Sequence, residues 1–287
     1  MSDVALGGPA RRPLSRSLLI HIALCACSLA MLYPLLWMLA SSFKDDSQIF
    51  SSASLWPSSF SLDAYIRGWS GLDISFGQFF WNSAVISGLS VVGNVFACSL
   101  TAFAFARLRF PGRGFWFALM LGTLMLPYHV TLIPQYVLFL NLDWVDTFLP
   151  LVVPKYLASD AFFIFLMVQF FRGIPRELDE AAMMDGCSPW KIYWKIILPL
   201  SKPVLATAAI FSFIWTWDDF FAPLIYLNDM GSYTVQLGLR NFVDSTGKSD
   251  WSALFAMSVL TLLPVFFFFL FFQRLLIEGV ATTGMKR

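Results

Sequence analysis

Residues 174–203 read IPRELDEAAMMDGCSPWKIYWKIILPLSKP, and this stretch predicts two short helices joined by a turn. Pro175 can occupy the first turn of a helix, where a missing N–H costs nothing. The acidic residues that follow lie where the helix dipole favours negative charge. Gly186 is placed to end this first helix in a left-handed conformation. Ser188 and Pro189 then predict the N-cap and the first position of a second helix.

The second predicted helix has an apolar aromatic face. Its large apolar residues recur at the i, i+3, i+4, i+7 spacing of one helical face, and they are Trp190, Tyr193, Trp194 and Ile197. Lys191 and Lys195 share another face, one turn apart. The apolar face must be buried either in the lipid interface, which would suit the two lysines, or in a socket of a soluble partner. The residues alone favour neither alternative.

On both sides of this stretch the chain is strongly apolar. Hydrophobic residues make up 58% of its 287 residues and charged residues only 13%, well below the roughly 25% typical of a soluble domain. A transmembrane helix needs about 20 mostly apolar residues, and in lipid each backbone polar group needs an internal partner. We therefore predict an all-α integral membrane protein with six transmembrane helices. The predicted spans are 18–43, 79–106, 114–140, 149–171, 203–227 and 251–272.

The first span follows three arginines and resembles a signal peptide in outline. Its apolar stretch is longer than the roughly 7–15 residues of a signal core, so we interpret it as a retained anchor. The predicted organisation is an N-terminal tail at 1–17, a membrane domain at 18–277 that contains a loop at 172–202, and a C-terminal tail at 278–287.

Orientation follows from the distribution of Lys and Arg. With the N-terminus inside and six spans, fourteen of the 19 Lys and Arg residues fall on the inner side. Cytoplasmic segments carry such an excess, so we place both termini and the 172–202 loop in the cytoplasm. The two polar segments on the outer side, 44–78 and 228–250, either face a soluble partner or are simple connectors.

Enzymatic motifs are missing from the sequence. Three of the four cysteines lie in apolar stretches and one in a basic loop, which is neither a disulfide framework nor a metal spacing. The nearest approach to a phosphate loop is Gly247-Lys248-Ser249, but Phe242 occupies the place of the first glycine. Neither H-E-x-x-H nor G-x-S-x-G is present. We expect no catalytic residue, metal or cofactor on this chain, and no nucleic-acid partner.

One run of residues carries a family resemblance. Glu180-Ala181-Ala182, Gly186, Ile196 and Leu198-Pro199 occupy every specified position of the pattern E-A-A-x3-G-x9-I-x-L-P. This run resembles the signature of the membrane subunits of bacterial ABC importers. Other runs are similar to the carbohydrate-uptake, maltose-permease-like branch, and they are Met125-Leu126-Pro127, Ile133-Pro134, Trp217-Asp218-Asp219-Phe220, Pro223-Leu224 and Glu278-Gly279-Val280. Two features depart from that branch: Asp218 stands where Asn is usual, and the end of the chain is not rich in Gly and Ala.

The resemblance implies a type I permease fold whose cytoplasmic loop is a coupling helix that docks on a separate ATPase subunit. It implies coupling roles for Glu180, Ala181, Ala182, Asp185, Gly186, Trp190, Ile196, Leu198 and Pro199. It also implies a second permease subunit, two ATPase subunits and an extracytoplasmic solute-binding protein, in a bacterial inner membrane. ATP and Mg²⁺ would bind to the ATPase subunits. The implied function is import of a sugar or related polyhydroxylated solute by alternating access.

The fifth and third spans contain candidate substrate-path residues. Ionisable groups within a span are costly, so Asp218 and Asp219 must face water or a partner. Beside Trp217, these carboxylates would suit a hydroxyl-rich ligand, although a structural pair bonded to a partner subunit is the alternative. In the third span, Tyr128, His129 and Gln135 form a polar patch near two prolines. The patch either lines a cavity or marks a kink packed against another helix.

Lys155 and Asp160 are the charged residues of the fourth span. Five residues apart on a continuous helix, they would point about 140° away from each other. The two side chains therefore need not pair with each other, and snorkelling of each to the outer surface is the simpler interpretation.

Two other classes of protein fit the sequence less well. A secondary transporter would predict ion-coupling charges and perhaps an internal repeat, and no clear repeat is present. A membrane enzyme acting on lipid would need a catalytic constellation, which the sequence lacks. Neither class explains the signature in the 172–202 loop.

Overall fold

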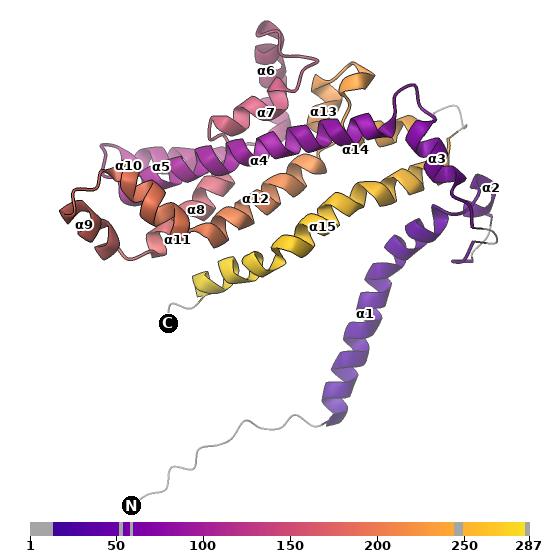
Figure 1. Cartoon of the computed structure of the whole chain (residues 1–287), viewed down its shortest axis with the longest axis horizontal. Coiled ribbons are helices and arrows are strands. Elements are labelled where there is room, and N and C mark those ends of the chain that lie inside the picture. The colour runs from indigo at the N-terminus through magenta and orange to yellow at the C-terminus, as the bar shows by residue number, and fades with distance from the viewer. Residues whose placement is uncertain (1–13, 52–53, 58–59, 244–248, 285–287) are drawn as a thin grey trace, which may run out of the picture.

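The computed structural model describes residues 14–51, 54–57, 60–243 and 249–284, and every regular element among them is a helix (Figure 1). Most of the predicted N-terminal tail, and Gly247 and Lys248 of the rejected phosphate-loop match, lie outside these residues. The elements are α1 (Leu14–Ser41), α2 (Asp46–Ile49), α3 (Asp63–Ser70), α4 (Phe76–Arg107), α5 (Arg113–Thr123), α6 (Tyr128–Asn141), α7 (Leu149–Tyr156), α8 (Ala161–Gly173), α9 (Glu177–Met184), α10 (Pro189–Ile192), the π-helix η1 (Tyr193–Ile197), α11 (Leu198–Leu200), α12 (Lys202–Trp217), α13 (Phe221–Tyr226), η2 (Met230–Ser232), α14 (Val235–Leu239), η3 (Arg240–Phe242) and α15 (Trp251–Gly284).

The predicted all-α membrane class is confirmed. Among the described residues, four stretches are long and apolar enough to cross a membrane, and there are six if each of two bent helix pairs counts as one span. One pair is α5 with α6, bent by 98°, and the other is 189–200 with α12, bent by 78°. The structure thus holds between four and six spans. α15 continues through Gly284, so the predicted domain border at 277 lies within a helix.

Three of the predicted spans are interrupted. The third breaks between Thr123 and Tyr128, where Pro127 lacks an N–H and disfavours helical geometry in the residue before it. The fourth breaks after Tyr156, and Ala158 adopts a left-handed conformation with φ 54°. The fifth ends at Trp217. A hydropathy profile does not reveal these breaks, because each is only a few residues long and some of those residues are themselves apolar.

The fifth span is interrupted because a side chain starts a new helix. The carboxylate Oδ1 of Asp219 accepts hydrogen bonds from the N–H groups of Phe221, at 3.0 Å, and Ala222, at 3.2 Å. Such a cap satisfies N–H groups that have no partner at a helix N-terminus. The predicted span 203–227 is therefore two helices, α12 and α13.

α4 is the central helix of the bundle, and it packs against α7, α8 and α12. Its buried side chains are small or polar at many positions, including Ser83, Ser87, Ser90, Asn94 and Ser99. Asn94 donates a hydrogen bond to the hydroxyl of Ser212 on α12, at 3.1 Å. A Cβ added to Gly93 would lie 2.5 Å from the ring of Tyr156, so α7 approaches α4 closely at this glycine. Small residues permit such contact between membrane helices, and buried polar side chains hydrogen-bond across them.

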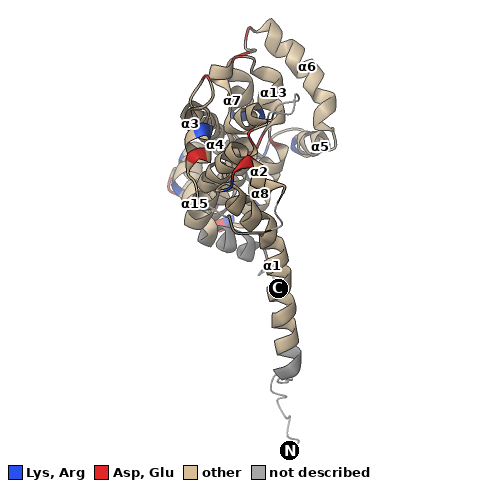
Figure 2. Cartoon of the chain, turned by 90° about the vertical axis from the view of Figure 1, so that its right-hand side faces the viewer, with Lys and Arg blue, Asp and Glu red and all other residues tan. Residues whose placement is uncertain are grey.

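α1 stands apart from the bundle, with its N-terminal end farthest from the other helices (Figure 1). Within Leu18–Ser41, the 18-residue window that qualifies as a membrane span has no buried residue, whereas Ser41 at the end of the helix is buried. Figure 2 shows α1 almost without charge, whereas acidic and basic residues gather near α2 and α3. There Arg67 on α3 pairs with Asp250, at 3.1 Å, and Asp46 accepts a hydrogen bond from the N–H of Ser252, at 2.7 Å. These contacts fix the start of α15.

The two ends of the bundle carry different elements. Helices α9, α10 and α11 lie at one end of α4, and α2, α3 and α14 lie at the other (Figure 1). The 32 residues of α4 span about 48 Å at 1.5 Å per residue. The 172–202 loop is therefore separated from the segments around α3 by about the thickness of a membrane.

Candidate functional site

The 172–202 loop contains the predicted pair of short helices. α9 has Glu177, Asp179 and Glu180 in its first turn, as predicted, although it begins two residues after Pro175. Gly186 adopts φ +77°, which confirms the predicted left-handed end. Its N–H donates to the carbonyl of Met183, at 3.0 Å, and the next N–H donates to that of Ala182, at 2.9 Å. This is a Schellman motif, which satisfies carbonyls left free at the end of a helix.

The second helix begins with the predicted cap. The hydroxyl of Ser188 accepts a hydrogen bond from the N–H of Lys191, at 3.4 Å, and Pro189 is the first helical residue. After Ile192 the helix widens into the π-helix η1, which runs into α11. Single π turns within helices frequently mark functional sites.

The aromatic face of the second helix packs mostly against the bundle of its own chain. Tyr193 and Ile197 are 0% exposed, and the hydroxyl of Tyr193 lies 2.7 Å from that of Ser99 on α4. Trp190 and Trp194 stay exposed at the rim. Neither predicted alternative, lipid interface or partner socket, included this contact, because the charge distribution places the end of the second span and the loop on the same side of the membrane but does not show which side chains touch. The two tryptophans remain available to an outside partner.

An ion pair joins α9 to the bundle. A guanidinium nitrogen of Arg107, the last residue of α4, lies 3.2 Å from the Oδ2 atom of Asp179, and the other donates to the carbonyl of Ile174, at 2.8 Å. Burial raises the pKa of Asp179 above its ordinary value, although the nearby Arg107 acts in the opposite direction. Sequence reasoning missed this pair, since its members lie in different predicted segments.

The coupling residues implied by the resemblance divide into exposed and buried groups. Ala182 is buried against the bundle, and Ile196 and Leu198 are partly buried. The exposed ones are Glu180, Ala181, Asp185, Gly186, Trp190 and Pro199. Met183 and Met184, which the sequence analysis did not single out, add exposed apolar surface, and Met184 is 90% exposed. Flexible, polarisable methionine suits a contact surface. The docking role of these residues stays a prediction.

The substrate-path candidates lie in two places. Asp219 lines a cavity of about 170 Å³ together with Lys155, Trp215, Thr216 and Thr234. Thr234 is 3% exposed, and its hydroxyl has no hydrogen-bond partner among the described residues. A buried polar group without a partner is costly, so this hydroxyl is a natural contact for a ligand or a water molecule. The cavity therefore combines a carboxylate, an ammonium, two hydroxyls and an aromatic ring.

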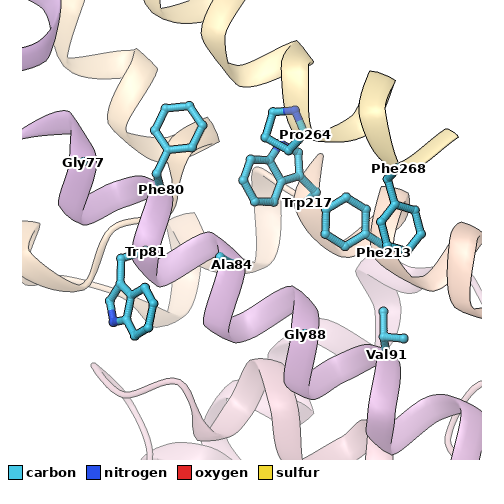
Figure 3. A pocket seen from close by; sticks show the side chains of 10 residues that line it. All are labelled: Gly77, Phe80, Trp81, Ala84, Gly88, Val91, Phe213, Trp217, Pro264 and Phe268. Atoms are coloured by element: carbon cyan, nitrogen blue, oxygen red, sulfur yellow. The ribbon is translucent and has the colours of Figure 1, made fainter. Parts of the chain in front are cut away.

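Trp217 lies apart from that cavity. It is 2% exposed, and its indole N–H donates to the carbonyl of Thr261 on α15, at 3.1 Å. It lines a larger, apolar groove of about 570 Å³ between α4, α12 and α15, beside Phe80, Phe213 and Phe268 (Figure 3). An indole held in this way serves packing between helices.

The other candidates lie on α6 and at the end of α12. The ring of His129 lies 5.2 Å from that of Phe221, so the patch on α6 reaches the start of α13, next to Asp219. Asp218 is exposed and accepts a hydrogen bond from Gln236, at 3.3 Å. Gln135 is exposed on α6, two turns beyond Tyr128. The structure thus brings Tyr128, His129 and Asp219 into one region.

The interpretation of Lys155 and Asp160 as separate snorkelling residues is wrong. Their side chains form an ion pair, with the ammonium 3.0 Å from Oδ2. The prediction assumed one continuous helix, but the chain breaks between α7 and α8, and the two residues face each other across the break. The pair places a cation beside the Asp219 cavity.

Within the described residues, no group of three or more His, Cys, Asp or Glu side chains is placed to hold a metal ion. The described helices thus form a multi-pass bundle that presents a helix pair at one end and contains a polar cavity lined from several helices.

Comparison with known proteins identifies the family. Residues 93–282 match the family described as binding-protein-dependent transport system inner membrane component. The chain is 33% identical to the probable ABC transporter permease protein YurM of Bacillus subtilis, over 90% of this chain and 85% of that protein. It is 32% identical to the arabinooligosaccharides transport system permease protein AraQ of Halalkalibacterium halodurans, over 94% and 96%. This chain belongs to the binding-protein-dependent transport system inner membrane component family.

Further comparisons agree. The sn-glycerol-3-phosphate transport system permease protein UgpE of Brucella abortus is 31% identical, over 95% of this chain and 98% of that protein. The fold is shared with a chain in the crystal structure of a bacterial ABC transporter involved in the import of the acidic polysaccharide alginate. That similarity has a TM-score of 0.80 at 23% identity, and it covers 93% of this chain and 99% of the other. The chain is thus a permease subunit of the ABC importer type.

Proposed function

We propose that this permease forms half of the membrane channel of an ATP-driven importer for a sugar or a related polyhydroxylated solute. It would pair with a second permease subunit, two ATPase subunits and an external solute-binding protein. ATP and Mg²⁺ would bind to the ATPase subunits, and both termini of this chain would lie in the cytoplasm of a bacterial cell. ATP-driven closure of the ATPases would displace the 172–202 loop and switch the helices between inward and outward access.

The observation that carries this proposal is the state of the 172–202 loop. It is ordered by its own caps and attached to α4, yet it presents Glu180, Met183, Met184 and Trp190 to the outside. Exposed apolar and charged side chains on a rigid helix suit docking into a groove of a partner. The signature pattern of the family falls on these same helices.

The substrate class rests on the Asp219 cavity. Its hydroxyls, carboxylate and ammonium can exchange hydrogen bonds with a polyol, and Trp215 can cover the apolar face of a sugar ring. Two of the relatives are named as transport system permeases for arabinooligosaccharides and for sn-glycerol-3-phosphate, and both cargoes carry hydroxyl groups. We infer a solute of the same class for this chain.

The orientation is tested by labelling single cysteines from each side of the membrane. The four native cysteines are replaced, and Met184→Cys is then labelled with a membrane-impermeant maleimide. We expect reaction in inside-out vesicles and none in right-side-out vesicles. Phe50→Cys, at an exposed residue near the other end of the bundle, is the matched control and should give the reverse pattern. Labelling of Met184→Cys in right-side-out vesicles would contradict the proposed function, which requires the 172–202 loop to lie in the cytoplasm.

The cavity is tested by removing one hydroxyl. Thr234→Val keeps the shape of the side chain but removes a hydroxyl that has no internal partner, so folding should be little affected. If the hydroxyl binds the solute, one lost hydrogen bond of about 1 kcal/mol lowers transport per complex about fivefold. Transport is measured in proteoliposomes with saturating solute-loaded binding protein. Thr123→Val is the control, because its hydroxyl is bonded to the carbonyl of Met120. Equal transport by both variants would contradict a role of this cavity in the path.

A further inference from the structure

α9 has few contacts that could transmit a force to the membrane helices. Of its eight residues only Ala182 is buried, and the small side chain of alanine offers little resistance to sliding. If a partner displaces α9, most of its surface moves with the partner. The connection to the bundle must therefore depend on a small number of specific contacts.

Arg107 supplies the strongest of these contacts. Its guanidinium pairs with Asp179 of α9 at 3.2 Å and donates to the carbonyl of Ile174 at 2.8 Å, so one side chain holds both the helix and the segment that leads into it. The side chains of Arg107 and Asp179 are only 3% and 13% exposed. Solvent screens such a pair far less than a surface ion pair, and the fork of the guanidinium fixes its direction.

The pair cannot easily exchange its partners. The Nε atom of Arg107 and the Oδ1 atom of Asp179 are buried without hydrogen bonds among the described residues. Separation of the two side chains would leave two buried charges unpaired, which is strongly unfavourable. The contact therefore behaves as a stiff link when α9 moves.

A second contact lies farther along the same helix. The hydroxyls of Ser99 on α4 and Tyr193 on η1 are 2.7 Å apart, and both residues are almost wholly buried. Ser99 and Arg107 are eight residues apart, or about 12 Å along α4. Two attachments at different positions along the axis of α4 can tilt the helix, whereas a single attachment at Arg107 can only pull on its end.

We propose that Arg107 and Asp179 are positioning residues that convert displacement of α9 into movement of α4. The inference rests on the proposed function, because it assumes that a partner moves α9. α4 packs against α7 and α12, and these helices contribute Lys155, Trp215 and Thr216 to the cavity beside Asp219. The ion pair thus joins the docking surface to the helices that line the polar cavity.

The test measures coupling rather than activity alone. The full complex, with second permease, ATPases and binding protein, is reconstituted in liposomes, and ATP hydrolysed per solute transported is determined. For Asp179→Asn we expect this ratio to rise at least threefold with the amount of assembled complex unchanged. Asp179→Glu keeps the charge and should restore part of the coupling. Glu177→Gln removes an exposed charge from the same turn of α9 and should behave as the unmodified chain.

The possible results distinguish an ion pair that transmits movement from α9 to α4 from one that only contributes to packing. If Asp179→Asn leaves the ratio of ATP hydrolysed to solute transported unchanged, whether or not both rates fall, the inference is overturned. Because Asp179→Asn could weaken folding, Arg107→Lys is a second variant that keeps the charge and loses the fork. Arg107→Lys should give a ratio between those of the unmodified chain and Asp179→Asn. If both variants give the ratio of the unmodified chain, the inference is also overturned. If the unmodified chain assembles with no ATPase, the proposed function fails instead.

Discussion

Replacement of Gly186 with valine is expected to reduce solute uptake at least tenfold, although the protein still reaches the membrane. Gly186 has φ +77°, a conformation that costs an L-residue about 1–2 kcal/mol and a β-branched residue more. No atom outside the glycine's own neighbourhood lies within 4 Å of an added Cβ, so the effect comes from the backbone and not from a clash. Valine would open the Schellman motif and redirect α10 relative to α9.

Uptake of labelled solute is measured in cells whose own copy of this permease is deleted, and the membrane content of the variant is measured by immunoblot. Gly186→Asn is the matched control, because asparagine tolerates the left-handed region better than other side chains. It should retain a large part of the uptake. Full uptake by the valine variant would show that the geometry of this turn does not matter for coupling.

Glu180→Lys should also reduce uptake at least tenfold, for a different reason. Glu180 is exposed in the first turn of α9, where it interacts favourably with the helix dipole. The loss of that interaction costs well under 2 kcal/mol, which is too little to unfold the loop. A docking contact with the ATPase, in contrast, would be replaced by repulsion or by an unpaired buried charge, which costs several kcal/mol.

Glu177→Lys distinguishes these two effects, because Glu177 is exposed in the same first turn and meets the same dipole. We expect Glu177→Lys to keep most of the uptake and Glu180→Lys to lose it. Binding of the ATPase subunit to detergent-solubilised permease provides a direct second measurement. Equal losses in the two variants would assign the role of Glu180 to the helix and not to the partner.

Local sequence signals predicted the structure well wherever the cause was local. The left-handed turn at Gly186 and the cap at Ser188 depend on residues within five positions of each other, and both are present. The apolar stretches likewise determined the all-helical membrane class, because burial of backbone groups in lipid leaves few alternatives. The predicted continuity of the third and fifth spans was wrong, because Pro127 and the Asp219 cap interrupt stretches that hydropathy treats as uniform. The fourth is still one candidate span, 149–173, although its helix breaks after Tyr156.

The Lys155–Asp160 pair shows why such a break matters. On one continuous helix the two residues diverge, and on the two helices of the structure they meet at 3.0 Å. The same reasoning applies to Trp217, whose sequence neighbours suggested a ligand but whose indole N–H bonds to α15. In both cases the position of a side chain depends on a neighbour that lies outside any sequence window.

By itself the sequence determined that the chain is a helical membrane protein, where its loop of two short helices lies, and which residues carry the family signature. Only the tertiary structure decided what holds that loop. It showed that Tyr193 turns inward to Ser99 and that Arg107 pairs with Asp179, 72 positions later in the chain. The physical reason is that helix signals arise from neighbours along the chain, whereas the contacts between α4 and the loop are set by packing of the whole bundle.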